Sequence, residues 1–149
     1  MPTNILRNTN ARAANKTQPR QHTDGNRIAA LVVGAVKLRV RLYDTLTAAR
    51  IWSALPLHST AETWGESIHF EVPVHTGRER NARLNVSPGD ICFWSEDDRV
   101  LIGFGPTPIS LPREIRLMRP CNIWAQALDD VGLLRSITPG EKVVLAAAR

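Results

Sequence analysis

Apolar and polar residues alternate along several short stretches of this chain, which is the pattern of strands with one buried face. From Val36 to Leu42 every second residue is apolar, and the residues between them are lysine or arginine. This period of two predicts a half-buried strand over 36–43. An apolar run at 28–33 precedes it across a glycine, so the two runs predict a hairpin. Further strands are predicted at 68–75, 91–94, 100–104, 122–128 and 143–146.

Two short segments have helical character instead. Residues 44–47, Asp-Thr-Leu-Thr, offer short oxygen side chains that can satisfy free N–H groups at a helix start, and apolar residues at helical spacing follow until Pro56. Residues 129–136 predict a short helix or a turn. Many short strands separated by turns are typical of a sandwich or barrel, and closure of the sheet removes exposed edges. The expected fold is all-β, a small closed barrel with one or two short helices.

The composition fits one globular domain and excludes several classes of protein. The 149 residues suffice for a real core, and 43% of them are hydrophobic. No stretch approaches the roughly 18 apolar residues of a membrane helix, so no membrane association is expected. The two cysteines, Cys92 and Cys121, lack a zinc spacing. We therefore expect a protein of the reducing cytoplasm, without a metal or other cofactor.

The positive charge lies mostly at the beginning of the chain. The net charge is +5, but residues 1–27 hold five basic residues against one aspartate and so contribute +4 of it. A folded nucleic-acid reader needs a basic face on the domain itself, so specific nucleic-acid binding is not expected. Residues 1–26 lack a sustained apolar period, which predicts a flexible basic tail before a domain at 27–149.

The stretch Gly103–Ser110, Gly-Phe-Gly-Pro-Thr-Pro-Ile-Ser, follows an apolar run and combines two glycines with two prolines. Proline ends a central strand because it lacks the N–H of the sheet ladder, and glycine allows a close backbone approach. The stretch is therefore a structural strand exit, the wall of a binding site, or both. We expect both roles, with a stiff loop bordering a cleft.

Four segments together resemble a known family. "DTLTAARIWSALP" from Asp44, "WGESIHFEVPV" from Trp64, "SPGDICFW" from Ser87 and "GFGPTP" from Gly103 are similar, in this order, to the bacterial and archaeal cyclophilin-like family. The resemblance covers about residues 27–145. It implies a compact version of the cyclophilin barrel, closed and mainly antiparallel, with one or two short helices.

Cyclophilins are prolyl isomerases. The resemblance implies their fold but argues against their catalytic chemistry. Lowering the barrier of an X–Pro bond takes an apolar socket and a cationic donor near the prolyl nitrogen. Cyclophilins place that arginine in a Phe-His-Arg-Val-Ile-Pro stretch, and the similar stretch here has Phe70 at its position. The Gln-Gly-Gly-Asp segment has no clear counterpart, and no histidine lies near 120–122. A weak isomerase would need a relocated arginine such as Arg80 or Arg83.

We therefore expect a binding module that holds a small molecule or short peptide in a cleft of the barrel. A weak isomerase is the alternative, and a hydrolase-associated module is a third hypothesis by fold analogy. Homo-oligomers are possible. The cleft is predicted to be lined by aromatic and placed polar residues: Trp64, Phe70, Glu71, Arg83, Trp94, Phe104, Thr107 and Pro108.

Two other features have simpler interpretations. His69, Glu71 and His75 share one strand face, but His69 and His75 lie about 20 Å apart on a straight strand, so a solvated face is expected rather than a metal site. The arginine-rich loop 76–83 either binds an anion or is solvated. An arginine near Phe104 would favour the isomerase. A deep apolar pocket capped by Glu71 or Arg83 would favour the binding module, and a filled cleft a partner-docking role.

Overall fold

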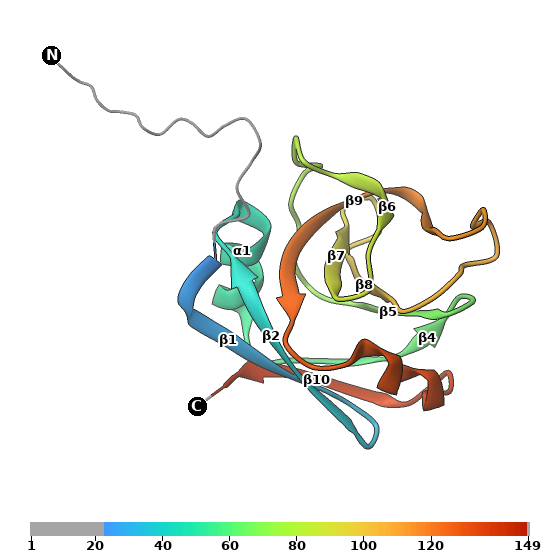
Figure 1. Ribbon diagram of the computed structural model, residues 1–149. Coiled ribbons are helices and arrows are strands. Elements are labelled where there is room, and N and C mark those ends of the chain that lie inside the picture. Colours follow the sequence, from blue (N-terminus) through green and yellow to red (C-terminus); the bar gives the residue numbers. More distant parts are fainter. Residues whose placement is uncertain (1–22, 149) are drawn as a thin grey trace, which may run out of the picture.

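A ten-stranded antiparallel sheet curls into a nearly closed barrel in the computed structural model, which describes residues 23–148 (Figure 1). The predicted tail lies outside the described residues up to residue 22, and β1 begins at Thr23. The strands are β1 (Thr23–Val33), β2 (Val36–Tyr43), β3 (Leu57–Thr60), β4 (Glu62–Thr63), β5 (Ser67–Glu71), β6 (Arg83–Val86), β7 (Asp90–Trp94), β8 (Arg99–Gly103), β9 (Ile115–Ala127) and β10 (Lys142–Ala147). The helices are α1 (Leu46–Ala54) and η2 (Val131–Ser136), a 3₁₀ helix.

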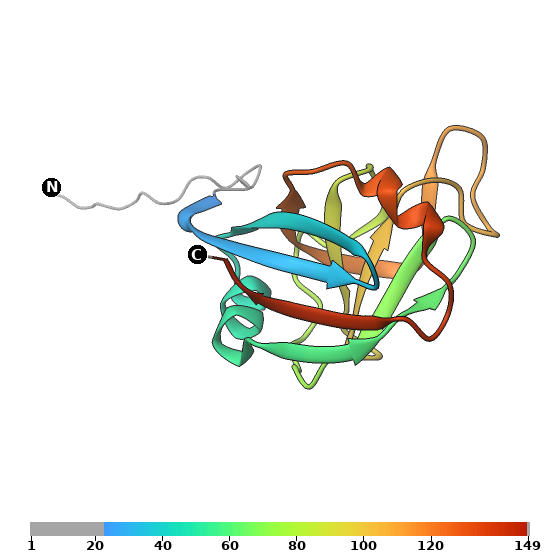
Figure 2. The same cartoon turned by 90° about the horizontal axis from the view of Figure 1, so that it is seen from below.

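The bent segment 57–63 brings the two ends of the sheet together. The strands follow the order β3-β10-β1-β2-β9-β7-β8-β5-β4, and β6 pairs with β9 outside this path. β3 and β4 stand at opposite ends of this order, yet only Ala61 separates them in the sequence. The segment pairs with β10 before Ala61 and with β5 after it. Figure 2 shows β3, β10 and β1 side by side. Closure of this kind removes free sheet edges.

Helix α1 begins where its capping residues predict. Thr45 Oγ1 accepts a hydrogen bond from the backbone N–H of Ala48 at 3.1 Å, which satisfies one free donor of the first turn. Ala48 and Ile51 are buried against the barrel core. α1 and η2 lie on opposite sides of the barrel (Figures 1 and 2). In the described part of the chain no helix is long and apolar enough to cross a membrane.

The sheet carries a core on each of its faces. The interior of the barrel holds the larger cluster, which includes Phe70, Phe93 and Trp124, each at most 1% exposed. A smaller cluster lies on the outer face and centres on Cys92 and Leu101. The first half of β9 and strand β6 cover this outer face. The region around β7, β8 and β9 is therefore two layers deep.

A buried amide ties the long loop 72–82 to this scaffold. Asn122, on β9, is fully buried, and its Nδ2 donates to Thr47 Oγ1 and to the Gly77 carbonyl, both at 3.0 Å. Its Oδ1 accepts from the backbone N–H of Glu79 at 2.7 Å. The Glu79 carboxylate in turn accepts from the backbone N–H of Thr47 at 2.8 Å. The loop, α1 and β9 are thus held by one network.

Most predicted elements are confirmed, and the differences have physical reasons. The hairpin β1–β2 and helix α1 form, and β7, β8 and β10 match their predicted ranges to within one residue at each end. β5 ends at Glu71 instead of extending to residue 75, because Pro73 cannot donate to a ladder. β9 begins at Ile115 rather than at 122, and the short, largely polar β3, β4 and β6 were not predicted.

Candidate functional site

A pocket of about 320 Å³ lies on the outer face of the sheet, between β5, β8 and β7 on one side and the first half of β9 on the other. Its lining surface is predominantly apolar. The lining consists of two indoles, further apolar side chains and four polar or charged residues: Trp64, His69, Trp94, Asp97, Arg99, Leu101, Leu117, Met118, Arg119 and Cys121.

The floor of the pocket follows the cross-strand register. His69 on β5 pairs with Leu101 on β8, which pairs with Cys92 on β7. In the adjacent row Arg99 on β8 pairs with Trp94 on β7. Directly opposed residues share one face of a sheet, so these side chains all lie on the outer face. The residues between them in sequence alternate to the barrel interior, where they form the larger core.

The opposite wall is the first half of β9. Leu117 and Cys121 are 1% and 2% exposed and pack with Cys92 and Leu101 in the outer cluster. Met118, by contrast, is 54% exposed and forms part of the rim. This half of β9 also pairs with β6. The wall is therefore anchored by apolar packing at its base and by a second strand at its side.

Trp64 closes one end of the pocket and belongs to a tight turn, residues 64–67. Its backbone N–H donates to the Ser67 carbonyl at 3.1 Å, and Ser67 Oγ donates to the Trp64 carbonyl at 2.5 Å. Gly65 has φ +59, and a Cβ added there would lie 2.7 Å from Pro108 Cδ and 2.8 Å from Thr107 Cα. Only glycine fits this close approach without strain. The turn that carries Trp64 is thus pressed against the loop 105–110.

Backbone hydrogen bonds lock the same two segments together. The N–H of Glu66 donates to the Pro106 carbonyl at 2.9 Å, and the N–H of Phe104 donates to the Glu66 carbonyl at 2.9 Å. Gly105 adds a longer bond to the Glu66 carbonyl at 3.2 Å. The stretch Gly103–Ser110 is therefore a strand exit that also supports the end wall of the pocket from behind.

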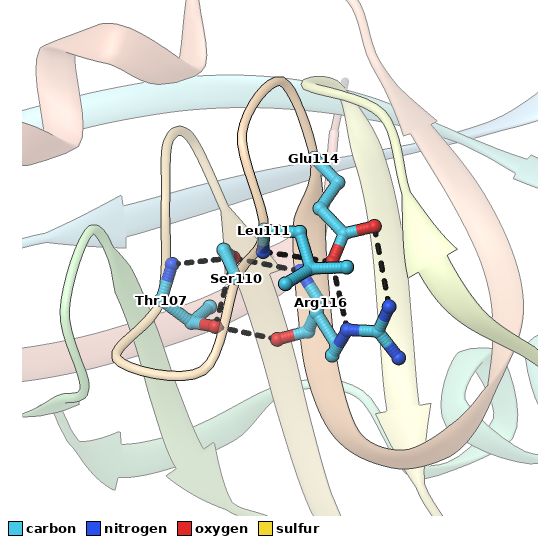
Figure 3. A network of polar contacts seen from close by, with 5 residues as sticks. All are labelled: Thr107, Ser110, Leu111, Glu114 and Arg116. Atoms are coloured by element: carbon cyan, nitrogen blue, oxygen red, sulfur yellow. Dashed lines mark hydrogen bonds and ion pairs between the residues drawn. The ribbon is translucent and has the colours of Figure 1, made fainter.

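Hydrogen bonds also hold the loop from Thr107 to Arg116 in one conformation (Figure 3). Thr107 Oγ1 donates to the Arg116 carbonyl at 2.6 Å, and Ser110 Oγ accepts from the backbone N–H groups of Thr107 and Arg116 at 2.9 and 3.0 Å. Glu114 accepts from Leu111 N–H and from Arg116 Nε, at 2.8 and 2.7 Å. These bonds hold the pKa of Glu114 below its usual value; the backbone N–H of Leu111 contributes most, and the Arg116 side chain adds to it. The loop joins β8 to β9 as a fixed brace.

Arg99 is the polar centre of the pocket. Its Nε donates to Asp97 Oδ2 at 2.9 Å, and its Nη1 lies 3.3 Å from His69 Nδ1. A guanidinium has no acceptor, so Nδ1 must accept and the imidazole proton lies on Nε2. Burial lowers the pKa of His69 below its ordinary 6.5, and the Arg99 charge acts in the same direction. His69 is therefore neutral at pH 7.

Two of the predicted cleft residues, Trp64 and Trp94, line this pocket. Phe70 lies in the barrel interior, 1% exposed, on the opposite face of β5. Phe104 is half-buried against the same interior core, with the Arg135 guanidinium 5.4 Å from its ring centroid. An arginine thus stands near Phe104, but neither residue lines the pocket.

The other four predicted residues lie around the pocket rather than in it. Glu71 is exposed, directly opposite Arg99 in the sheet register, and Arg83 is exposed at the start of β6. Thr107 is 5% exposed within the braced loop, and Pro108 is exposed and packs on Gly65. The structure does not bring the eight residues into one cleft, and neither Glu71 nor Arg83 caps the pocket.

Sequence reasoning missed most of the outer-face residues. The alternation at 68–75 separates His69 from the apolar face of the strand, but the face of His69 was predicted to be solvated rather than part of a pocket. Leu101 is itself buried within the continuous apolar run of β8, so no alternation there separated the outer face from the interior. Leu117 and Met118 gave no usable signal, since arginines and a proline interrupt the pattern of β9.

The residues described around this site form neither a cluster of metal ligands nor a reactive thiol. Among the described residues no group of three histidine, cysteine or acidic side chains could hold a metal ion. His75 instead pairs with Asp98 at 2.7 Å. Burial raises the pKa of Cys92 well above its usual value and that of Cys121 to about 12. Both thiols therefore stay protonated and inert at neutral pH.

A family model described as Cyclophilin-like matches residues 27–146, and the chain belongs to this family. A solved relative is the hypothetical protein AF2241 from Archaeoglobus fulgidus, known as a solution structure. It is 29% identical to this chain, with a TM-score of 0.71, and the match covers 83% of this chain and 95% of that one. The resemblance of the four sequence segments to the cyclophilin-like family is thereby confirmed.

A more distant likeness concerns the fold alone. The structure of McbB in complex with tryptophan is 14% identical, with a TM-score of 0.60. The match covers 79% of this chain and 44% of that one. No curated protein matches the chain.

Proposed function

We propose that this protein is a binding module of the cyclophilin-like family, whose ligand is a small molecule or short peptide held in the outer pocket. The observation that carries the proposal is the pocket itself, about 320 Å³ and predominantly apolar, between Trp64, Trp94 and β9. Ligand sites are typically mostly apolar clefts of about 300–1,000 Å³ with a few placed polar groups. The pocket is at the small end of this range.

The rigidity of the pocket supports the same proposal. Its end wall rests on the interlocked segments 64–67 and 103–110, and its floor is a paired sheet. A preformed site loses little conformational entropy on binding. The two free, buried cysteines fit a protein working in a reducing, cytoplasmic setting.

A thermal-shift screen against small aromatic and aliphatic compounds and short peptides tests the proposal. Ligands that bind the folded state raise the melting temperature by mass action. Met118→Trp places a bulky side chain at the pocket rim, and Leu133→Trp is its matched control, because the two residues are 54% and 53% exposed and Leu133 lies on η2, outside the pocket.

The expected result is a set of compounds that stabilise the wild type and Leu133→Trp but stabilise Met118→Trp much less. The proposal is refuted if no compound shifts the melting temperature. It is equally refuted if the shifts are the same in all three proteins, because the ligands would then bind elsewhere.

A residual prolyl isomerase is the second candidate, and Arg99 is the observation in its favour. Its guanidinium lies in an apolar pocket, 23% exposed, and a cation beside an apolar socket is what the reaction requires. Arg80 and Arg83 are exposed and do not line the pocket. Arg135 stands near Phe104 but is 58% exposed and pairs with Glu66.

An isomerase assay on Ala-Pro and Leu-Pro peptides separates the two candidates. We expect the wild type to be silent, since the cyclophilin arginine position is taken by a core phenylalanine. Activity that disappears in Arg99→Gln and survives in Arg135→Gln would establish the isomerase with Arg99 as its cation.

A further inference from the structure

The hydrogen-bonding groups left over in the outer pocket are almost all donors. Arg99 has five N–H groups; one goes to Asp97 and one to His69, and no described residue accepts from the remaining three. Asp97 is the one acidic side chain of the lining, and its Oδ2 already accepts from Arg99. The Trp94 Nε1–H of the lining is buried and has no acceptor among the described residues, and a buried donor without an acceptor costs free energy. The pocket therefore favours a ligand that brings acceptors.

His69 adds a further donor of fixed identity. Because its Nδ1 accepts from Arg99, the neutral ring carries its proton on Nε2 and can donate from there. Asp97 accepts a hydrogen bond from Nε of the Arg99 guanidinium, and His69 accepts one from its terminal Nη1. The group is thus held in place before any ligand arrives, which suits it for planar recognition of a carboxylate.

A second cation stands at the rim. Arg119 on β9 lines the pocket and is exposed, and no described residue accepts from its guanidinium. Three acidic side chains lie near the pocket but do not line it: Glu62, which is opposite His69 in the sheet register, Glu71 and Glu96. Glu96 pairs with Arg78, and Glu71, although opposite Arg99 in register, is exposed and makes no described ion pair with it. The two arginines of the lining outweigh its single aspartate.

We propose that the outer pocket binds an aromatic or other apolar group joined by a short chain to a carboxylate, with the ring between Trp64 and Trp94 and the carboxylate on Arg99. This inference rests on the proposed function and names its ligand class. The carboxylate belongs either to a free organic acid or to the C-terminus of a peptide that ends in an apolar residue. The pocket volume, about 320 Å³, admits one ring and a short acid chain.

Calorimetric titrations with matched acid and amide probes test the proposal on the full chain. The free-acid pair is 3-phenylpropanoic acid and 3-phenylpropanamide, and the peptide pair is acetyl-Ala-Phe with a free or amidated C-terminus. We expect at least one acid to bind roughly tenfold or more tightly than its amide, the usual scale for a hydrogen bond to a charged group. Tight binding of the peptide acid alone assigns the carboxylate to a C-terminus, and binding of phenylpropanoic acid assigns it to small acids.

Three variants locate the carboxylate. Arg99→Gln removes the central cation and is expected to weaken acid binding by about tenfold to a hundredfold while amide binding changes little. Arg119→Gln alters only an exposed rim residue, so its fold is not at risk, and a smaller loss of acid binding is expected. Arg80→Gln is the matched control, an exposed arginine outside the pocket, and should leave all affinities unchanged.

The proposal is overturned if each amide binds as tightly as its acid in the wild type, or if Arg99→Gln and Arg119→Gln both leave acid binding unchanged. If Arg99→Gln does not fold, the acid–amide comparison and Arg119→Gln still decide. Amide and acid binding that are equal, and equally lost in Met118→Trp, would overturn the carboxylate inference while supporting a binding pocket. If no probe binds, the carboxylate inference fails, and the thermal-shift screen judges the proposed function separately.

Discussion

Replacing Gly65 by alanine should both destabilise the fold and damage the pocket. Gly65 has φ +59, a conformation that costs an ordinary residue about 1–2 kcal/mol. The added Cβ would also lie 2.7–2.9 Å from Pro108 Cδ, Thr107 Cα and the Pro106 carbonyl oxygen. Two of these three atoms are backbone of a braced loop, so they cannot move aside freely. Overpacking of this kind costs about 1–3 kcal/mol, so we expect a total loss of about 2–5 kcal/mol.

Two other glycines separate the contributions of conformation and contact. Gly89 has φ +100 but open space around its Cβ position, so Gly89→Ala should cost only about 1–2 kcal/mol. Gly77 has open space and no positive φ, and Gly77→Ala should change stability little. Urea unfolding gives the three free energies. In a chain of this size each kcal/mol also lowers Tm by about 2–4 °C.

The same substitution has a functional consequence. The clash pushes the turn 64–67 away from the loop 105–110, so Trp64 shifts at the end of the pocket. Gly65→Ala should therefore weaken ligands of the pocket more than Gly89→Ala does. The reasoning is refuted if Gly65→Ala is no less stable than Gly89→Ala, or if ligand affinity is the same in both.

Three further predictions concern the scaffold and its titrating groups. Asn122→Ala removes three buried hydrogen bonds and should lower the free energy of unfolding by about 3 kcal/mol. Asn85 on β6 is exposed, so Asn85→Ala should change this free energy by under about 0.5 kcal/mol; equal losses in urea would contradict this. The pKa of His69 is lowered in the folded state, so as the pH falls through 6.5 this imidazole is protonated in the unfolded chain before it is protonated in the folded chain. Stability should fall from there down to the folded pKa, and His69→Gln should flatten that part of the urea-derived pH profile. Cys92 and Cys121 should resist iodoacetamide at pH 8 in the folded protein and react in urea, as mass spectrometry would show; rapid labelling of the folded chain would contradict their raised pKa values.

The fold was predictable because its signals are local. Val36–Leu42 alternates cleanly because one face of β2 is buried, and Thr45 caps α1 through a contact three residues away. Closure of the barrel at Ala61 left no such signal, since β3 and β4 are short and β3 pairs with β10, the last strand of the chain. A pairing between strands so far apart in the sequence depends on how the residues between them fold.

The site was predictable only in part, for a related reason. The alternation at 68–75 separates Phe70 from His69, but it does not show which face of the sheet carries a pocket, and Trp94 lies in an apolar run without alternation. The outer pocket depends on the first half of β9 folding over the sheet, where Pro120 and two arginines obscure the apolar pattern. The glycine–proline stretch at 103–110 was correctly interpreted as a strand exit. Its contact with Gly65 needed the structure.

The central claim, that the outer pocket binds ligands, is tested most directly by the four tryptophan indole N–H signals in a nitrogen-15 NMR spectrum. Trp64 and Trp94 line the pocket, whereas Trp52 lies on α1 and Trp124 in the barrel interior. Titration with 3-phenylpropanoic acid and then with its amide should move the Trp64 and Trp94 signals with at least one probe, leaving the other two in place. Signals that all stay fixed with both probes, or that all four move alike, would contradict a ligand in this pocket.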